Sequence, residues 1–110
     1  MAEITAAMSI GYNWLYEDLD SAPRKTVEQA IIYKGIQQLI KPRIKPYWWE
    51  KSYDRFAQVC YAGIAIVALA IYETQPSIAA KAVAQAVQKS QKILKNTYGP
   101  KGGYASGPTY

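Results

Sequence analysis

The sequence contains one long apolar run, VCYAGIAIVALAIY, from Val59 to Tyr72. A helix built from this run is apolar on nearly every side, so it has to be covered on every side. The run is shorter than the roughly 18–20 residues that a membrane-spanning helix needs, which favours a buried helix. A chain of 110 residues forms only a few helices, so we expect a neighbouring chain to complete the cover.

The rest of the chain is also helical in pattern, which predicts a single all-α domain over residues 1–98. We expect three to four helices, with two long helices packed against a shorter N-terminal helix and assembled in a helical oligomer. Residues 99–110 are rich in Gly and Tyr and are expected to form an extended tail. The expected elements are a short helix within 3–17, a helix over 23–40 with Ser21 as N-cap, an extended connector over 41–46, a helix from Tyr47 or Trp48 to Glu73, and a helix over 76–96.

The composition argues against catalysis and against a metal centre. The chain has no histidine, which removes the commonest general base and the commonest metal ligand. Its one cysteine, Cys60, lies in the apolar run and is expected to be a buried, inert thiol. The acidic cluster Glu17, Asp18 and Asp20 matches no calcium-loop spacing. We therefore expect no catalytic residues, no metal and no cofactor.

Charge is distributed unevenly along the chain, whose net charge is +5. Residues 1–20 contain acids but no Lys or Arg, residues 24–45 are basic, and no Asp or Glu follows Glu73. A basic surface of this kind attracts polyanions such as nucleic acid or anionic lipid.

The last predicted helix carries the clearest candidate binding surface. At 100° per residue, its Lys and Gln side chains fall within a sector of roughly 120°, opposite an Ala-rich face. Lys that alternates with Gln and lacks nearby acids suits a phosphate backbone, whereas solvated helix faces usually mix both signs of charge. The Ala-rich face is expected to pack helices closely and to join subunits.

The connector KPRIKPYWWEK, residues 41–51, is the second candidate. Pro42 and Pro46 stiffen the backbone, so the cations between them lose little entropy on binding. Trp48 and Trp49 either pack against another helix, which we favour, or stack on unpaired bases. Together the basic segments give the candidate nucleic-acid-binding residues Arg24, Lys25, Lys34, Lys41, Arg43, Lys45, Lys81, Lys89, Lys92 and Lys95.

In size, helical content, acid-poor basic helix and Gly/Tyr-rich end, the chain resembles the DNA-wrapping major capsid proteins of archaeal filamentous viruses. These proteins assemble helically around double-stranded DNA and hold it in the A form. The resemblance concerns the layout and no shared motif, so no residue role is transferred. It implies a nucleocapsid protein of the virion, assembled in the host cytoplasm, with double-stranded DNA, further copies or a paralogous coat subunit, and a lipid envelope as partners.

Two other functions remain open on the sequence. A pilin-like or membrane-associated filament subunit would bind no nucleic acid and would place residues 56–72 in lipid. A small chromatin-type protein would bind DNA as a dimer without forming a filament.

Overall fold

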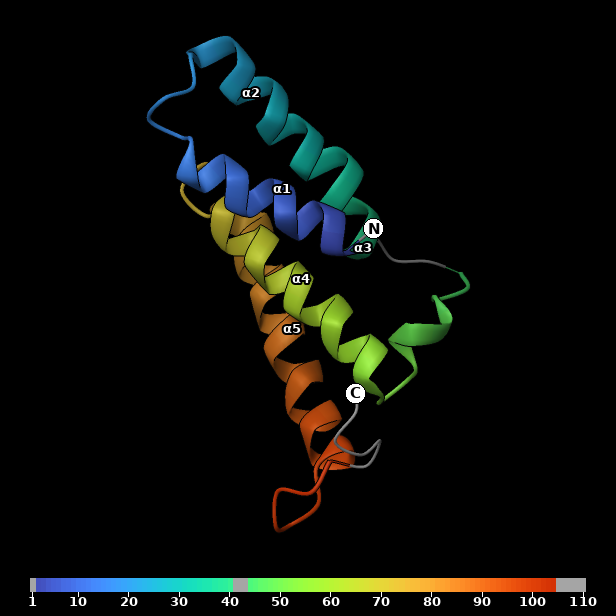
Figure 1. The fold of residues 1–110 in the computed structure, drawn as a ribbon. Helices are drawn as coiled ribbons and strands as arrows, with labels where there is room; N and C mark the ends of the chain where they lie inside the picture. Colours follow the sequence, from blue (N-terminus) through green and yellow to red (C-terminus); the bar gives the residue numbers. More distant parts are fainter. Residues whose placement is uncertain (1, 41–43, 105–110) are drawn as a thin grey trace.

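The computed structural model describes residues 2–40 and 44–104, and it consists of stacked helices (Figure 1). In chain order the elements are α1 (Ala2–Trp14), α2 (Ser21–Ala30), the π-helical segment η1 (Ile31–Ile36), α3 (Gln37–Ile40), the 3₁₀ helix η2 (Trp48–Glu50), α4 (Arg55–Ala70) and α5 (Pro76–Thr97). No strand forms among the described residues, so the predicted all-α class is confirmed for them.

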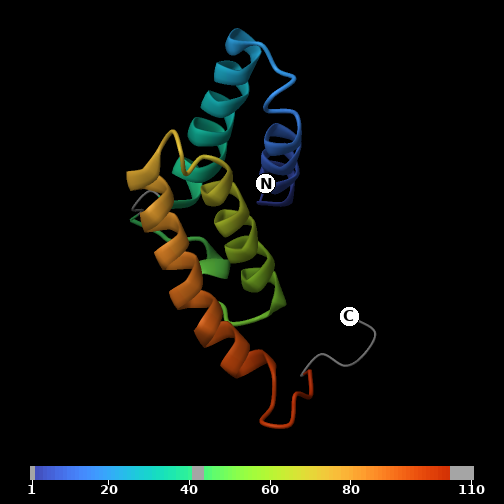
Figure 2. The same ribbon diagram turned by 90° about the vertical axis from the view of Figure 1, so that its left-hand side faces the viewer.

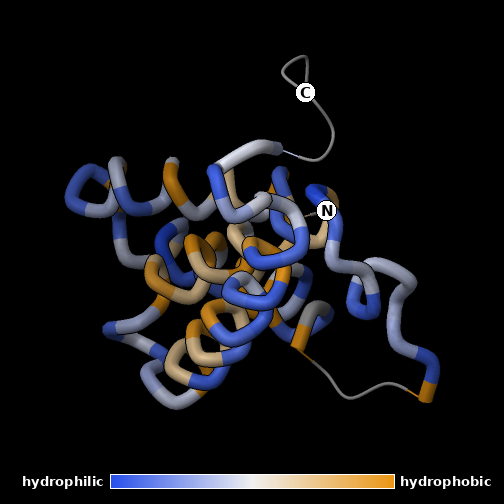
Figure 3. Tube along the Cα trace, turned by 90° about the horizontal axis from the view of Figure 1, so that it is seen from below, coloured by the Kyte–Doolittle hydropathy of each residue, from blue (hydrophilic) through white to orange (hydrophobic). Residues whose placement is uncertain are grey.

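Helix α4 is the centre of the molecule and lies between α1 and α5 (Figure 2). Its residues Tyr61, Ile64 and Val67 are buried almost completely. Seen along another axis, the apolar positions gather in the interior of the stack and the polar positions surround them (Figure 3). Burial of these side chains provides the main stabilisation, at about 25 cal/mol for each Å² of apolar surface removed from water.

The Ala-rich face of α5 packs against α4 of the same chain. Ala79, Ala82 and Ala86 are at most 1% exposed, and their small side chains let the two helices approach closely. The chain itself therefore covers these three alanines, whereas Val87 and Leu94 at the edge of the same face remain exposed. The prediction of a helix over 76–96 is confirmed by α5.

Helix α1 fits closely against two glycines. A side chain at Gly63 in α4 would come within 3.2 Å of Ala2, and a side chain at Gly35 in η1 would overlap the Cγ2 methyl group of Thr5. Within α1, the buried Ser9 hydroxyl donates a hydrogen bond to the Thr5 carbonyl at 2.8 Å. The two glycines thus set how near α1 lies to the rest of the bundle.

The contact at Gly35 gives a testable prediction. Gly35→Ala is expected to lower the free energy of unfolding by about 1–2 kcal/mol, because the added methyl group overpacks a tight contact. Thr5→Ser removes the opposing methyl group and keeps the hydroxyl. In the Thr5→Ser background, Gly35→Ala should therefore be neutral or stabilising, since Ala favours helix over Gly by up to about 1 kcal/mol. Urea unfolding of the four proteins in this double-mutant cycle measures the coupling, and independent effects would refute the contact.

The helix predicted over 23–40 is present as the continuous stretch α2–η1–α3, from Ser21 to Ile40. Ser21 is its first helical residue and Asp20 occupies the N-cap position in an extended conformation, so the N-cap assignment to Ser21 is wrong by one residue. The π-helical turn adds a residue within the stretch, and it buries Ile31, Ile32 and Ile36 together with Gly35. Hydrophobic periodicity predicts the stretch but does not reveal the π turn.

The single helix expected from Tyr47 or Trp48 to Glu73 is wrong, because two local caps divide it. The Glu50 carboxylate accepts a hydrogen bond from the Tyr47 backbone N–H at 3.0 Å and closes η2. The Asp54 carboxylate accepts one from the Ala57 N–H at 3.1 Å and starts α4. Hydrogen bonds from Ser52 and from the Ala57 backbone lower the pKa of Asp54, because they favour its charged form.

The described part of the C-terminal segment, which ends at Tyr104, contains a tight turn. Tyr98 and Tyr104 form an isolated antiparallel bridge with their rings 5.4 Å apart. The Gly99 N–H donates to the Gly103 carbonyl at 2.8 Å, and Gly102 adopts a φ of +79° that favours glycine. Residues 105–110 lie outside the described residues.

Candidate nucleic-acid interface

Helix α5 presents lysines to solvent along its whole length. Lys81, Lys92 and Lys95 are exposed, and no carboxylate of the described residues lies within ion-pair distance of them. Lys81 and Lys92 are separated by about 16 Å along the helix axis, at 1.5 Å per residue. We call Lys81, Lys92 and Lys95 the α5 lysine face.

The structure brings the connector next to this face. The Lys89 Nζ atom lies 3.5 Å from the Glu50 carbonyl oxygen in η2. About two helical turns further on, the Thr97 hydroxyl donates to the Tyr53 carbonyl at 3.3 Å. The segment from Glu50 to Tyr53 therefore runs beside α5, and Lys89 is half-buried against it, unlike the exposed members of the lysine face.

The two tryptophans of the connector have different environments. Trp49 is buried and packs edge-on against Tyr61 of α4, with ring centroids 5.4 Å apart. Trp48 is 64% exposed and contacts Phe56 on one side, at 4.9 Å. Packing against a helix, the favoured interpretation of both residues, thus holds fully for Trp49 and only in part for Trp48.

Arg24 is engaged within the chain. Its Nη2 atom donates to the carbonyl oxygens of Tyr16 at 2.6 Å and Leu19 at 2.9 Å, and its guanidinium lies 4.0 Å from the centre of the Tyr16 ring. Close by, burial and the Glu28 carboxylate raise the pKa of Tyr12. Arg24 therefore clamps the turn between α1 and α2, and the interface proposed below does not include it.

The remaining sequence candidates are spread over the molecule. Lys25 is exposed on α2, at the end of the molecule remote from the C-terminal half of α5 (Figure 1). Lys34 is exposed on η1, and Lys45 is exposed in the connector. Lys41 and Arg43 lie outside the described residues. The eight candidates among the described residues do not form one surface, and the lysines of α5 are the largest group.

Two further cations belong near this group although the sequence reasoning did not select them. Lys51 is exposed and directly follows Glu50, whose carbonyl meets Lys89. Lys101 is exposed in the turn after α5. Lys101 could have been found from the absence of acids after Glu73, whereas Lys51 follows an acid in the sequence and its place beside α5 depends on tertiary packing.

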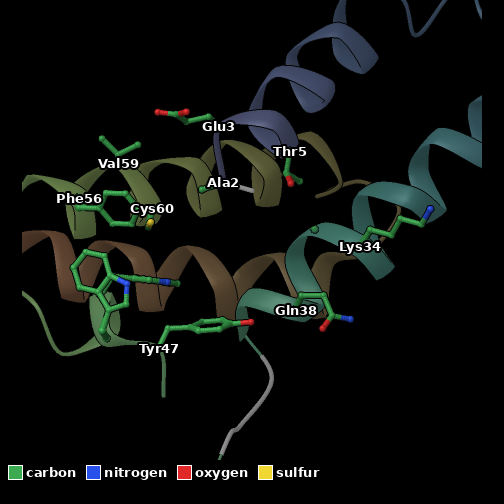
Figure 4. Close-up of a pocket in the computed structure, with 12 residues that line it drawn as sticks. Ala2, Glu3, Thr5, Lys34, Gln38, Tyr47, Phe56, Val59 and Cys60 are labelled. Atoms are coloured by element: carbon green, nitrogen blue, oxygen red, sulfur yellow. The ribbon is translucent and has the colours of Figure 1, made fainter. Parts of the chain in front are cut away.

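A hollow of about 380 Å³ lies between the start of α1, η1, η2 and α4 (Figure 4). Aromatic and small apolar side chains dominate its lining, and the charged ends of Lys34 and Glu3 point away from it. Cys60 reaches the lining, and burial raises the pKa of its thiol, which therefore stays protonated at neutral pH. These groups do not converge as a nucleophile and its base would.

No model of a known protein family matches the sequence, and no curated protein is detectably similar to it. Among the described residues, no group of three or more acidic or Cys side chains is placed to hold a metal ion. Within the described ranges 2–40 and 44–104, every helix is too short or too polar to cross a membrane.

Proposed function

We propose that this protein is a structural nucleoprotein that self-assembles and coats double-stranded DNA without reading its sequence. In this proposal the α5 lysine face lies along the phosphate backbone, and the connector adds cations beside it. The proposal extends to a role as a virion nucleocapsid protein of the archaeal filamentous type, assembled in the host cytoplasm, alone or with a paralogous coat subunit.

The observation that carries the DNA part of the proposal is the acid-free lysine face. Ion pairing within the chain would make such lysines unavailable, but no carboxylate of the described residues pairs with Lys81, Lys92 or Lys95. Each lysine that reaches a phosphate releases condensed counterions, and the gain does not depend on base sequence. A helix that makes only phosphate contacts binds DNA without preference for a particular base sequence.

The spacing of the lysines agrees with a duplex backbone. The distance of about 16 Å from Lys81 to Lys92 corresponds to about five base-pair steps at 3.4 Å each. Gln88 is exposed between them and can donate hydrogen bonds to phosphate oxygens. The helix thus offers contacts over about half a turn of DNA.

The need for further copies is supported by apolar surface that the single chain leaves uncovered. Large apolar side chains on α1, α4 and α5 are exposed, among them Trp14 at 79% and Leu69 at 65%. The radius of gyration is 15.4 Å, whereas a compact domain of this length has a value of about 13 Å. A chain of this shape buries less of its own surface than a compact monomer does, which suits a subunit of an assembly.

Binding of wild-type protein to a 30-base-pair duplex of random sequence, followed by fluorescence anisotropy from 50 to 300 mM salt, tests the proposal. We expect binding that weakens steeply with salt and is equal for unrelated sequences. Purified protein should also carry nuclease-sensitive nucleic acid that gives excess absorbance at 260 nm. Absence of binding at 50 mM salt would refute the DNA-coating function.

The exposed apolar surface also fits a second function, a filament subunit that associates with lipid and binds no nucleic acid. Such a protein would show no absorbance excess at 260 nm and would need detergent or lipid for purification. The same binding titration therefore separates the two functions.

A further inference from the structure

Three helices leave large apolar side chains exposed. We define the apolar face as Ile10 and Trp14 of α1, Ile66 and Leu69 of α4, and Val87 and Leu94 of α5, all of which are exposed. Monomeric soluble proteins rarely leave a contiguous apolar patch of this extent uncovered.

These side chains lie on one side of the molecule. On α5, Val87 and Leu94 project roughly 120–160° around the helix from Lys81 and Lys92, at 100° per residue. The Lys89 side of α5 faces η2, and so does the side of α4 that carries Phe56 and Cys60. Because η2 covers this side of both helices, the flanks of α4 and α5 that point away from η2 lie together on the opposite side of the molecule.

Helix α1 extends the same face. A groove of about 260 Å³ runs between α1 and α4, and Ile10 and Trp14 line it from one helix while Ile66 and Leu69 line it from the other. The apolar face is therefore continuous across α1 and α4, and α5, which carries Val87 and Leu94, lies against α4 on the side away from α1 (Figure 2).

Charge is absent from the middle of this face. No charged residue occurs in residues 4–16 or 56–72, which supply its α1 and α4 parts. The molecule measures 48 × 33 × 20 Å, so its broad side has room for the roughly 800 Å² per partner that a standard protein interface buries. The missing charge and the available area both fit a protein partner with an equally apolar surface.

We propose that the apolar face is the interface of a symmetric dimer, in which it packs against the same face of a second copy. The proposal deepens the self-assembly part of the proposed function and rests on it. With the twofold axis parallel to α4, α1 of each copy lies over α5 of its partner, because α1 and α5 flank α4 on opposite sides.

Sedimentation velocity at 20 µM protein, after removal of nucleic acid, tests the dimer. Wild type should sediment with about twice the 12.3 kDa mass of the chain. Leu69→Glu and Trp14→Glu place a charge on the face from two different helices, and each should weaken dimerisation at least 100-fold and give a monomer. Tyr33→Glu is the matched control: Tyr33 is 59% exposed on η1, outside the apolar face, and its variant should remain dimeric. Far-UV circular dichroism checks that all three variants are folded.

The outcomes separate this inference from the function on which it rests. A wild-type monomer that still binds DNA would overturn the dimer and leave the DNA-coating function standing. If wild type is a dimer, both Glu variants are monomers, and wild type does not bind DNA, the result would support the dimer interface and refute the DNA-coating function. A wild-type monomer that floats with phosphatidylcholine vesicles would overturn the dimer by assigning the face to lipid.

Discussion

Neutralising the α5 lysine face is expected to cause the largest loss of DNA affinity among variants that keep the fold. The triple variant Lys81→Gln, Lys92→Gln and Lys95→Gln removes three phosphate contacts, so the slope of log K against log salt should become shallower by about 2.7. Between 50 and 200 mM salt, wild type should therefore lose about 40-fold more affinity than the variant. Anisotropy titrations of both proteins at four salt concentrations measure the two slopes.

Single variants test whether the position of the removed charge matters. Lys92→Gln should reduce the slope by about 0.9, whereas Lys25→Gln, which removes the same charge from α2, should leave it nearly unchanged. Equal effects of the two variants would show that net charge, and not the α5 lysine face, drives binding. An unchanged slope in a folded triple variant would exclude this helix as the interface.

Arg24→Ala is expected to cause the largest loss of stability from a single charged residue. Two carbonyl oxygens, those of Tyr16 and Leu19, accept hydrogen bonds from the guanidinium, and hydrogen bonds to charged groups contribute about 1.5–3 kcal/mol each. The cation also lies over the Tyr16 ring. Because the site is only partly buried and the turn can relax, both of which reduce the sum, we expect the free energy of unfolding to fall by about 2–3 kcal/mol in urea titrations.

Arg24→Lys distinguishes the clamp from a DNA contact. Lysine keeps the charge but has a shorter side chain and no flat guanidinium to lie over the Tyr16 ring, so part of the stability loss should remain. DNA affinity of the folded Arg24→Lys protein should equal that of wild type. Unchanged stability in Arg24→Ala, together with weaker DNA binding, would return Arg24 to the interface.

The helices that the sequence predicts well are those whose pattern is local. The pattern of small residues and lysines in α5, together with Pro76 at its start, places that helix almost to the residue. The stretch from Ser21 to Ile40 is likewise found from its apolar periodicity. In both cases the signal depends only on neighbours along the chain.

The sequence-based predictions fail where a short polar contact or tertiary packing determines the local structure. Asp54 and Glu50 divide the expected long helix through side-chain hydrogen bonds to backbone N–H groups, and apolar periodicity does not register such caps. The different environments of Trp48 and Trp49 depend on which ring meets Tyr61. Arg24 looks like any basic residue in the sequence, and only the return of the chain after α1 places two carbonyl oxygens within its reach.

The 20 Å thickness of the molecule has a consequence for how its sequence can diverge. Substitutions more than about 7–10 Å apart that share no partners usually act additively. Residues on the two broad sides of this thin subunit meet that condition. In the proposed assembly, selection could therefore adjust affinity for DNA and affinity between subunits in separate steps, without a change on one side forcing a compensating change on the other.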